Sequence, residues 1–226
     1  MYVTEPGSAR LFEDDRIIWA EQVFGGFKEL NVLELGPLEG GHSYLMQNGG
    51  AKQITAIEAN SRSFLKCLCI KQILKLDRVE FQLGDFMAYL EQKPPAVDLV
   101  LASGVLYHMQ EPLKLLQHIA AISPRAFIWT HYYDADVISQ RPELQPKFGT
   151  IETITHNGMT YQCARQSYQD ALEWAGFCGG SKPTSRWLTR ASLEQALGDF
   201  GYTDLCYAFE QPDHPNGPAV AICAQR

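Results

Sequence analysis

The sequence lacks the features of membrane proteins and of disulfide-stapled proteins. No uninterrupted apolar run approaches the roughly 20 residues that a membrane-spanning helix needs. Residues Met1 to Arg16 show no basic stretch followed by an apolar core, so no leader is indicated. None of the six cysteines belongs to a C-x-x-C pair, which predicts reduced, mostly buried thiols instead of a redox or zinc motif. We therefore expect a cytoplasmic protein without membrane contact.

Internal repeats, low-complexity tracts and an excess of basic charge are also missing. The chain has 19 Lys and Arg against 26 Asp and Glu, a net charge of −7, which disfavours a nucleic-acid partner. The basic residues Lys66, Lys71, Lys75 and Arg78 have no interleaved aromatics, so they are interpreted as a solvated helix face. With 226 residues, 46% of them hydrophobic, the chain suits a single domain with one core.

The first 130 residues alternate between strand-like and helix-like segments. An amphipathic stretch at 9–27 comes first, and in 61–76 the spacing of Leu65, Leu68, Gln72 and Leu76 predicts a shared helix face. Five such steps predict a parallel sheet with helices on both faces. The expected strands are 31–35, 53–58, 79–83, 97–103 and 126–130, and the expected helices between them are 43–48, 61–76, 86–92 and 111–123.

The last third departs from this alternation. About 55 residues separate the fifth strand from a helix that a capping box at Ser192 and Gln195 is expected to open. Within this insertion, Asn157-Gly158 between two extended runs predicts a hairpin, and a helix is expected at 168–175. Runs at 203–210 and 219–224 predict a terminal antiparallel hairpin. The expected organisation is one domain, 1–226, made of an N-terminal helical cap (1–29), a core (30–133), a lid insertion (134–187) and a C-terminal helix with hairpin (188–226).

Two acidic residues accompany a glycine-rich turn, Gly36 to Gly41, at the end of the first strand. Doubly wound sheets bind nucleotides at such a turn. Glu58 follows Gly36 by 22 positions, close to the spacing of about 20 at which an acid binds ribose hydroxyls. Glu34, inside the first strand, needs a cationic partner. The alternatives are a local arginine for Glu34 and a helix cap for Glu58.

Together with Ala56–Asn60, Gly84–Phe86 and Ser103–His108, these motifs resemble the class I S-adenosylmethionine (SAM) dependent methyltransferases over about residues 30–130 and the terminal hairpin. The resemblance implies an α/β, Rossmann-like, doubly wound and mostly parallel seven-stranded sheet with a C-terminal antiparallel hairpin. Leu38 stands where that family has its middle glycine. The Ser-Gly-Val-Leu-Tyr-His segment is similar to that of the wobble-uridine carboxymethyl transferases acting on transfer RNA.

The resemblance also implies a set of SAM contacts. Glu34 would face the ammonium group of the methionine part, Asp85 the adenine amino group and Phe86 the adenine ring. Asp85 could instead be only an N-cap. The expected cofactor residues are Glu34, Gly36, Pro37, Gly40, His42, Glu58, Ala59, Gly84, Asp85, Phe86, Ser103, Gly104 and Val105.

Methyl transfer requires alignment of the acceptor and removal of its proton. The ends of strands four and five carry the candidate bases His108 and His131, and Tyr107 and Tyr132 complete the expected catalytic set. Either histidine could instead only orient its loop. No metal is expected, because His131 with Asp134 and Asp136 lacks a diagnostic spacing. The expected substrate contacts, from the N-terminal helix and the insertion, are Arg16, Trp19, Tyr133, Arg186 and Trp187.

The function expected from these features is methylation of a small molecule by SAM under a closing lid. The insertion could instead be a structural flap or a homodimer contact. The alternative functions are a transfer-RNA methyl or carboxymethyl transferase, a SAM-binding subunit without catalysis, and a NAD-dependent oxidoreductase. Two residues count against NAD: Leu38 replaces a glycine that pyrophosphate requires, and Glu34 would lie near phosphate.

Overall fold

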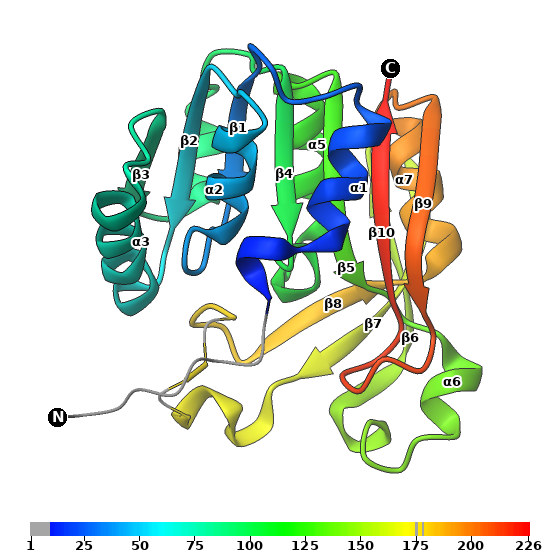
Figure 1. Ribbon diagram of the computed structural model, residues 1–226. Coiled ribbons are helices and arrows are strands. Elements are labelled where there is room, and N and C mark those ends of the chain that lie inside the picture. Colours follow the sequence, from blue (N-terminus) through cyan, green and yellow to red (C-terminus); the bar gives the residue numbers. More distant parts are fainter. Residues whose placement is uncertain (1–9, 175, 178) are drawn as a thin grey trace, which may run out of the picture.

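The computed structural model, which describes residues 10–174, 176–177 and 179–226, contains a seven-stranded sheet of order β3-β2-β1-β4-β5-β10-β9 (Figure 1). The strands β1 to β5 are parallel, and β10 pairs antiparallel with both β5 and β9. This confirms the predicted mixed sheet and its terminal hairpin. The bounds are β1 Asn31–Leu35, β2 Gln53–Glu58, β3 Val79–Leu83, β4 Leu99–Ser103, β5 Arg125–His131, β9 Asp204–Gln211 and β10 Ala219–Gln225.

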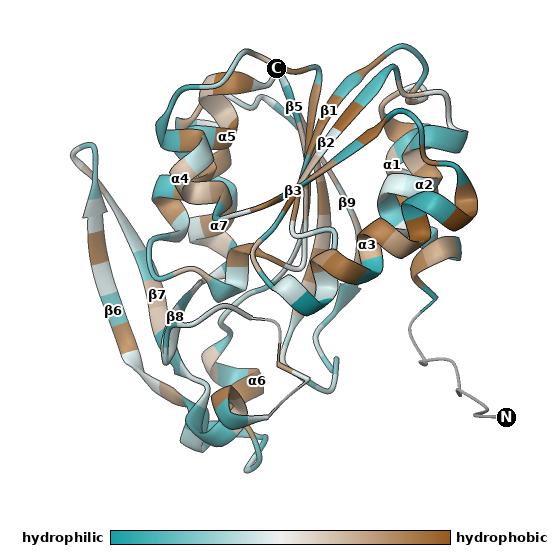
Figure 2. Ribbon diagram, turned by 90° about the vertical axis from the view of Figure 1, so that its left-hand side faces the viewer, coloured by the Kyte–Doolittle hydropathy of each residue, from teal (hydrophilic) through white to brown (hydrophobic). Residues whose placement is uncertain are grey.

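Helices cover both faces of this sheet (Figure 2). Helices α1 (Asp15–Val23), α2 (Gly41–Asn48) and α3 (Ser61–Leu74) lie on one side, and α4 (Phe86–Glu91), α5 (Pro112–Ile122) and α7 (Arg190–Asp199) on the other. Successive strand residues therefore enter different cores: Val32 packs in one apolar cluster and Leu33 in the other. Burial on both faces explains why the central strands are almost entirely apolar.

The insertion after β5 forms a second, three-stranded antiparallel sheet of order β6-β7-β8. The strands are β6 (Phe148–His156), β7 (Met159–Ser167) and β8 (Thr184–Leu188), preceded by helix α6 (Ala135–Ser139). The predicted Asn-Gly hairpin is present, with Asn157 and Gly158 at φ values of 51° and 81°. Strand β8 was not predicted. The expected boundary between the lid insertion and the C-terminal part, after Trp187, lies inside this strand. Below the main sheet, this second sheet faces the carboxyl ends of the parallel strands (Figure 1).

Three helix predictions need correction. The amphipathic stretch at 9–27 is a 3₁₀ turn at Leu11–Glu13 followed by the shorter α1, and its expected first residue, Ala9, lies outside the described residues. Helix α7 begins earlier than the proposed capping box, because Thr189 is its N-cap and accepts the N–H of Ser192. The helix expected at 168–175 is a 3₁₀ turn at Gln169–Glu173, and Ala175 is again outside the described part.

The predicted apolar face of α3 is wrong at Leu65 and Leu68, whereas Leu76 is buried but lies beyond the end of the helix at Leu74. Leu65 and Leu68 are 61% and 40% exposed, whereas Cys67 is fully buried. The reason is the position of α3 beside β3, the edge strand of the sheet (Figure 1). There the helix packs its small residues against the glycine-rich loop, and the Cys67 Sγ donates to the carbonyl of Leu38 at 3.5 Å.

The described cysteines, Cys67, Cys69, Cys163, Cys206 and Cys223, are free thiols, and Cys69 is exposed. Cys178 lies outside the described residues. Among the helices of the described part, none is long and apolar enough to cross a membrane.

Candidate active site

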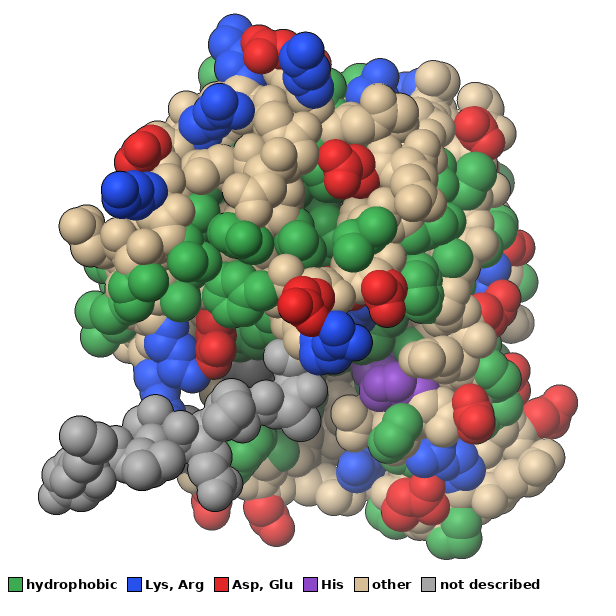
Figure 3. Space-filling view, viewed as in Figure 1, with side chains coloured by type: hydrophobic (Ala, Val, Ile, Leu, Met, Phe, Trp, Pro, Cys, Tyr) green, Lys and Arg blue, Asp and Glu red, His purple; other side chains and the backbone are tan. Residues whose placement is uncertain are grey.

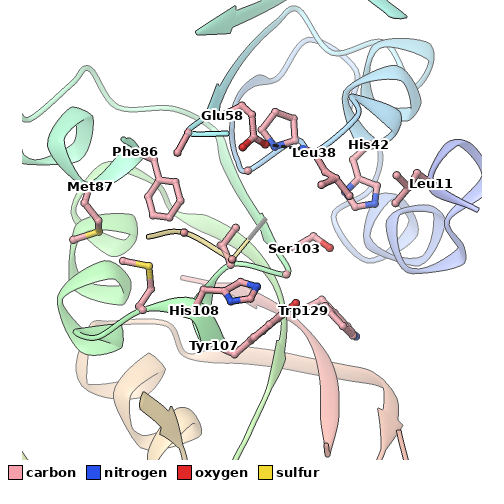
Figure 4. Close-up of a pocket in the computed structure, with 18 of the residues that line it drawn as sticks. Leu11, Leu38, His42, Glu58, Phe86, Met87, Ser103, Tyr107, His108 and Trp129 are labelled. Atoms are coloured by element: carbon pink, nitrogen blue, oxygen red, sulfur yellow. Dashed lines mark hydrogen bonds between the residues drawn. The ribbon is translucent and has the colours of Figure 1, made fainter. Parts of the chain in front are cut away.

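A pocket of about 1160 Å³ lies at the carboxyl ends of β1 to β5 (Figure 4). Its wall includes the loops after β1 and β3, the ends of β2 and β4, and Trp129 of β5. The N-terminal segment, the segment from β4 into α5, the 179–182 loop of the insertion and the β9–β10 hairpin also contribute. This is the crevice in which doubly wound sheets bind their ligands.

In the glycine-rich loop, a residue other than glycine adopts a left-handed backbone conformation. Leu38 has a φ of 56°, in the left-handed region that side chains disfavour. Its N–H donates to Glu58 Oε2 at 2.9 Å. At Gly36, with a φ of 66°, an added Cβ would lie 2.8 Å from Val105 Cγ1, so this position admits no side chain without movement of Val105.

Glu58 is a buried carboxylate in the pocket wall, 5% exposed. Besides the Leu38 bond, its Oε1 accepts the N–H of Asn60 at 2.8 Å. Burial raises the pKa of Glu58, although backbone N–H donors oppose the rise. Each carboxylate oxygen has more than one acceptor site, so Glu58 can accept further bonds from hydroxyl groups in the pocket.

Glu34 lies behind the pocket wall, next to the side chain of His42. It is 1% exposed and accepts the hydroxyl of Ser43, while its Oε1 has no hydrogen-bond partner. That oxygen is 3.8 Å from Nδ1 of His42, which does line the pocket. Burial raises the pKa of Glu34. An unpartnered buried carboxylate oxygen favours a positive charge nearby.

The N-terminal segment adds Asp14 and Arg16 to the wall. Asp14 Oδ2 lies 2.9 Å from His42 Nε2, and the Arg16 guanidinium pairs with the same carboxylate. Burial opposes ionisation of Asp14, but His42 and Arg16 outweigh it and hold the pKa of this carboxyl well below its usual range. The Arg16 guanidinium carbon also lies 4.4 Å from the centre of the Trp129 ring, a cation–π arrangement.

The opposite wall comes from the loop after β3. Asp85 caps α4 by accepting the N–H of Met87 at 2.8 Å, and it also lines the pocket. Phe86 projects into the pocket (Figure 4). At Gly84 an added Cβ would meet nothing within 4 Å, so the pocket is open at this point.

His108 and Tyr107, on the 3₁₀ turn Leu106–His108 after β4, line the pocket next to Trp129 (Figure 4). His108 Nδ1 lies 2.5 Å from the Tyr168 hydroxyl. Burial, followed by the charge of His131, lowers the pKa of His108 to about 4. His108 is therefore a neutral imidazole at neutral pH.

His131 is 4% exposed and, in the described part of the chain, lies outside the pocket wall. Its Nδ1 is 2.9 Å from the carbonyl oxygen of Gly217, and its ring stacks on Trp187 at 4.9 Å between centroids. Burial lowers its pKa to about 4. The structure thus separates the two histidines that the sequence paired as candidate bases.

Several other predicted residues also lie away from the pocket. Tyr132 is buried in the core, Tyr133 packs against Phe148 and Trp19 against Phe209. The predicted residues that line the pocket are Arg16, Gly36, Pro37, His42, Glu58, Ala59, Gly84, Asp85, Phe86, Ser103, Gly104, Val105, Tyr107 and His108. Those that the structure puts outside its wall are Trp19, Glu34, Gly40, His131, Tyr132, Tyr133, Arg186 and Trp187.

Sequence reasoning missed the contributions of Asp14, Trp129, Phe209, Gln211 and His214 to the wall. Asp14 has only the local signature of a helix cap, and the others belong to segments expected merely as strands or turns. As for metals, no group of three or more His, Cys, Asp or Glu among the described residues could hold an ion. Asp134 caps α6 instead, accepting the N–H groups of Asp136 and Val137.

Comparison with known proteins identifies the family. Residues 27–173 match the model of a methyltransferase domain. The chain belongs to this family, and it is a class I SAM-dependent methyltransferase, as the sequence motifs predicted. Its cofactor is SAM. No curated protein matches the sequence.

Solved structures share the fold at low identity. The N-terminal domain of EvdMO1, crystallised in the presence of S-adenosylhomocysteine (SAH) and D-fucose, is 22% identical with a TM-score of 0.73, over 98% of this chain and 85% of that chain. Magnesium protoporphyrin IX methyltransferase of Synechocystis PCC 6803, with bound SAH, is 14% identical with a TM-score of 0.61, over 94% and 81%. The 1,6-didemethyltoxoflavin-N1-methyltransferase of Burkholderia thailandensis is 14% identical with a TM-score of 0.60, over 97% and 79%.

Proposed function

We propose that this enzyme methylates a small-molecule acceptor held beside SAM in the pocket at the carboxyl ends of the parallel strands, and that His108 is its general base. The size of the pocket carries the proposal. At about 1160 Å³ it exceeds the 300–1,000 Å³ typical of a site for one drug-sized ligand. SAM and a compact acceptor are therefore a suitable pair of occupants.

The residues present fit the cofactor. We assign Glu58 to the ribose hydroxyls, Asp85 to the adenine amino group and Phe86 to the adenine ring, with the open space at Gly84 on the same wall. Glu34 would act on the ammonium end through His42, because its free oxygen lies behind that ring. When bound, SAM supplies a methyl carbon activated by positively charged sulfur.

The acceptor would lie toward Tyr107, Trp129 and His214. These rings and the guanidinium of Arg16 form a largely aromatic wall that also carries polar groups, a combination typical of small-molecule sites. His108, neutral at pH 7 because of burial, would accept the proton of the acceptor. Such proton removal typically contributes 10²–10⁴-fold to a rate.

Charge supports a small molecule over RNA. The net charge is −7, and on the face shown in Figure 3 basic side chains alternate with acidic ones. Arg16, a cation of the pocket wall, is already paired with Asp14. Two structural neighbours were crystallised with small molecules, one in the presence of D-fucose and one with bound 1,6-didemethyltoxoflavin.

The test incubates the protein with radiolabelled SAM and, separately, a fractionated small-metabolite extract and total RNA. We expect label in a small-molecule fraction, and incorporation that is slower by roughly 10²–10⁴-fold with a His108→Ala variant that still binds SAM. Label confined to RNA, lost steeply with added salt as phosphate contacts are screened, would contradict the proposed acceptor class. Mass spectrometry of ligand released from the purified protein would separately detect a carboxylated SAM.

A further inference from the structure

Strand β6 is an unpaired edge of the insertion sheet. The sheet order is β6-β7-β8, so among the described residues β6 pairs with β7 on one side and with no strand on the other. It has nine residues, Phe148–His156, more than the usual five or six. In Figure 2, β6 lies at the outer border of the molecule, on the side of β7 away from the helices. An accessible edge of this kind is a template for another strand.

The hydrogen bonds of β7 show which groups of β6 face outward. The carbonyl of Gln162 accepts the N–H of Thr189 at 2.9 Å, so the backbone groups of Gln162 are directed away from β6. Thr153 is the β6 partner of Gln162, and its N–H and C=O therefore point away from β7. The same alternation directs the groups of Ile151 and Thr155 outward. Their outward groups have no hydrogen bond to another described residue.

Strand β6 lacks the devices that commonly protect an edge, which are short length, lysine, proline and charge. The edge strands β3 and β8 have only five residues each, and the edge strand β9 carries exposed Asp204 and Glu210. Strand β6 is regular over 151–156, where it has one acidic residue, Glu152, and no lysine, arginine or proline. Ile151 is 48% exposed at this edge.

The edge is complementary to a second copy of itself. Two copies related by a two-fold axis would pair antiparallel, and outward residues must meet outward residues to exchange hydrogen bonds. With the axis at Thr153, that residue faces itself and Ile151 faces Thr155, so every outward residue of 151–155 is paired. Glu152 then faces Ile154. An axis at Glu152 would put two carboxylates directly opposite each other, and an axis at Ile154 would leave Ile151 opposite the turn.

We infer that β6 is the interface of a homodimer, in which the β6 edges of two copies pair antiparallel about a two-fold axis at Thr153. The two insertion sheets then form one continuous sheet. A second copy is the occupant that this edge favours, because the same uncharged backbone edge supplies both halves of the contact. The pocket wall includes none of the described residues 148–156, so the inference does not depend on which acceptor is methylated.

Analytical ultracentrifugation over a wide range of protein concentration tests the dimer. Wild type should show a monomer–dimer equilibrium that depends on concentration. Thr153→Lys should be monomeric at the same concentrations, because it places two like charges opposite each other on the axis. Thr160→Lys is the matched control, since Thr160 is an exposed threonine of β7, the inner strand of the sheet. It should dimerise as wild type does, and both variants should bind SAH with wild-type affinity.

Disulfide cross-linking tests the position of the axis. At the axis, the two copies of position 153 would have Cα atoms about 5.5 Å apart, within the range of roughly 4.4–6.8 Å that a disulfide spans. Thr153→Cys should therefore form a covalent dimer under mild oxidation, in a Cys69→Ser background because Cys69 is exposed. Ile151→Cys should form little covalent dimer, because the two copies of position 151 would lie about 13 Å apart along the strands.

Wild type that stays monomeric at every concentration, or a dimer that Thr153→Lys leaves intact, would overturn the inference. Cross-linking that is absent from Thr153→Cys, or equally efficient in Ile151→Cys, would overturn it too, since the strands would then lack the inferred register. The wild-type sedimentation result needs no variant to fold. None of these measurements involves turnover, so the interface and the proposed function can fail separately.

Discussion

Glu58 accepts the backbone N–H of Leu38 at 2.9 Å, and this bond joins the end of β2 to the loop that follows β1. Leu38 adopts a left-handed backbone, with a φ of 56°, which costs roughly 1–2 kcal/mol for a residue with a side chain. The hydrogen bond helps to offset that cost. The loop and the acidic residue therefore form one unit, although 20 positions separate them in the chain.

Replacing Glu58 by alanine should weaken SAM binding by about 1–3 kcal/mol, because hydroxyl donors lose a charged acceptor and Leu38 loses the bond that holds its turn. Isothermal titration calorimetry measures the affinity. Glu39→Ala is the matched control, since Glu39 belongs to the same loop but pairs outward with Lys66. Equal affinity of Glu58→Ala and wild type would refute the ribose role.

The two histidines should respond differently to replacement. His108→Ala is expected to lower methyl transfer by roughly 10²–10⁴-fold with little change in SAM affinity, because His108 faces the pocket. His131→Ala should mainly lower stability, since His131 is packed on Trp187 and bonded to Gly217. Thermal unfolding and single-turnover rates measured on both variants test this. A larger rate loss for His131→Ala would show that the base lies on β5.

Asp14 should stabilise the protein in a pH-dependent way. Its pKa is lowered on folding by His42 and Arg16 against the effect of burial. The Asp14 carboxylate therefore contributes fully to the free energy of unfolding above its unfolded pKa of about 3.9. This contribution is lost as the pH falls toward the lower pKa of the folded state. Asp14→Asn, which retains the helix cap, should be less stable than wild type at pH 6, and the difference should shrink below about pH 4.

Denaturant unfolding from acidic to neutral pH would measure this difference. The neighbouring exposed pair offers a control, because Glu13→Gln removes a carboxylate whose partner within the described residues is Arg10. A stability gap between wild type and Asp14→Asn that stays constant with pH would contradict the ion-pair assignment.

Glu34→Gln should have the opposite effect on stability. Burial raises the pKa of Glu34, so its favourable contribution exists at low pH and is lost as the pH rises through the folded pKa. At pH 7 we expect the ligand-free variant to unfold at a higher temperature, by roughly 2–4 °C per kcal/mol for a chain of this size, and to bind SAM less tightly. Thermal unfolding measured with and without SAM tests the expected stability and the expected loss of affinity. A ligand-free variant that unfolds at a lower temperature than wild type at pH 7 would contradict the expected gain in stability.

The main sheet and most of the cofactor wall could be predicted, because their signals are local. The apolar runs of β1 to β5 and the distance from Gly36 to Glu58 depend on short stretches of chain, and both predictions led to residues of the same pocket. The terminal hairpin was recognisable for the same reason.

Other parts depend on contacts between distant segments. Asp14 enters the wall only because the N-terminal segment crosses the glycine-rich loop, and His214 only because the β9–β10 hairpin folds toward Trp129. Strand β8 has just five residues and owes its place to pairing with β7. The apolar face of α3 was mispredicted because periodicity cannot tell that a helix lies at the edge of a sheet.

The contact between Gly41 and Leu11 makes one end of the pocket sensitive to a single methyl group. An added Cβ on Gly41 would lie 2.6 Å from the carbonyl oxygen of Leu11, which is backbone and cannot rotate aside. A side chain there would lift the N-terminal segment and carry Asp14 and Arg16 away from His42 and Trp129. The close approach of the N-terminal segment to the first turn of α2 thus keeps Asp14 and Arg16 in the pocket wall.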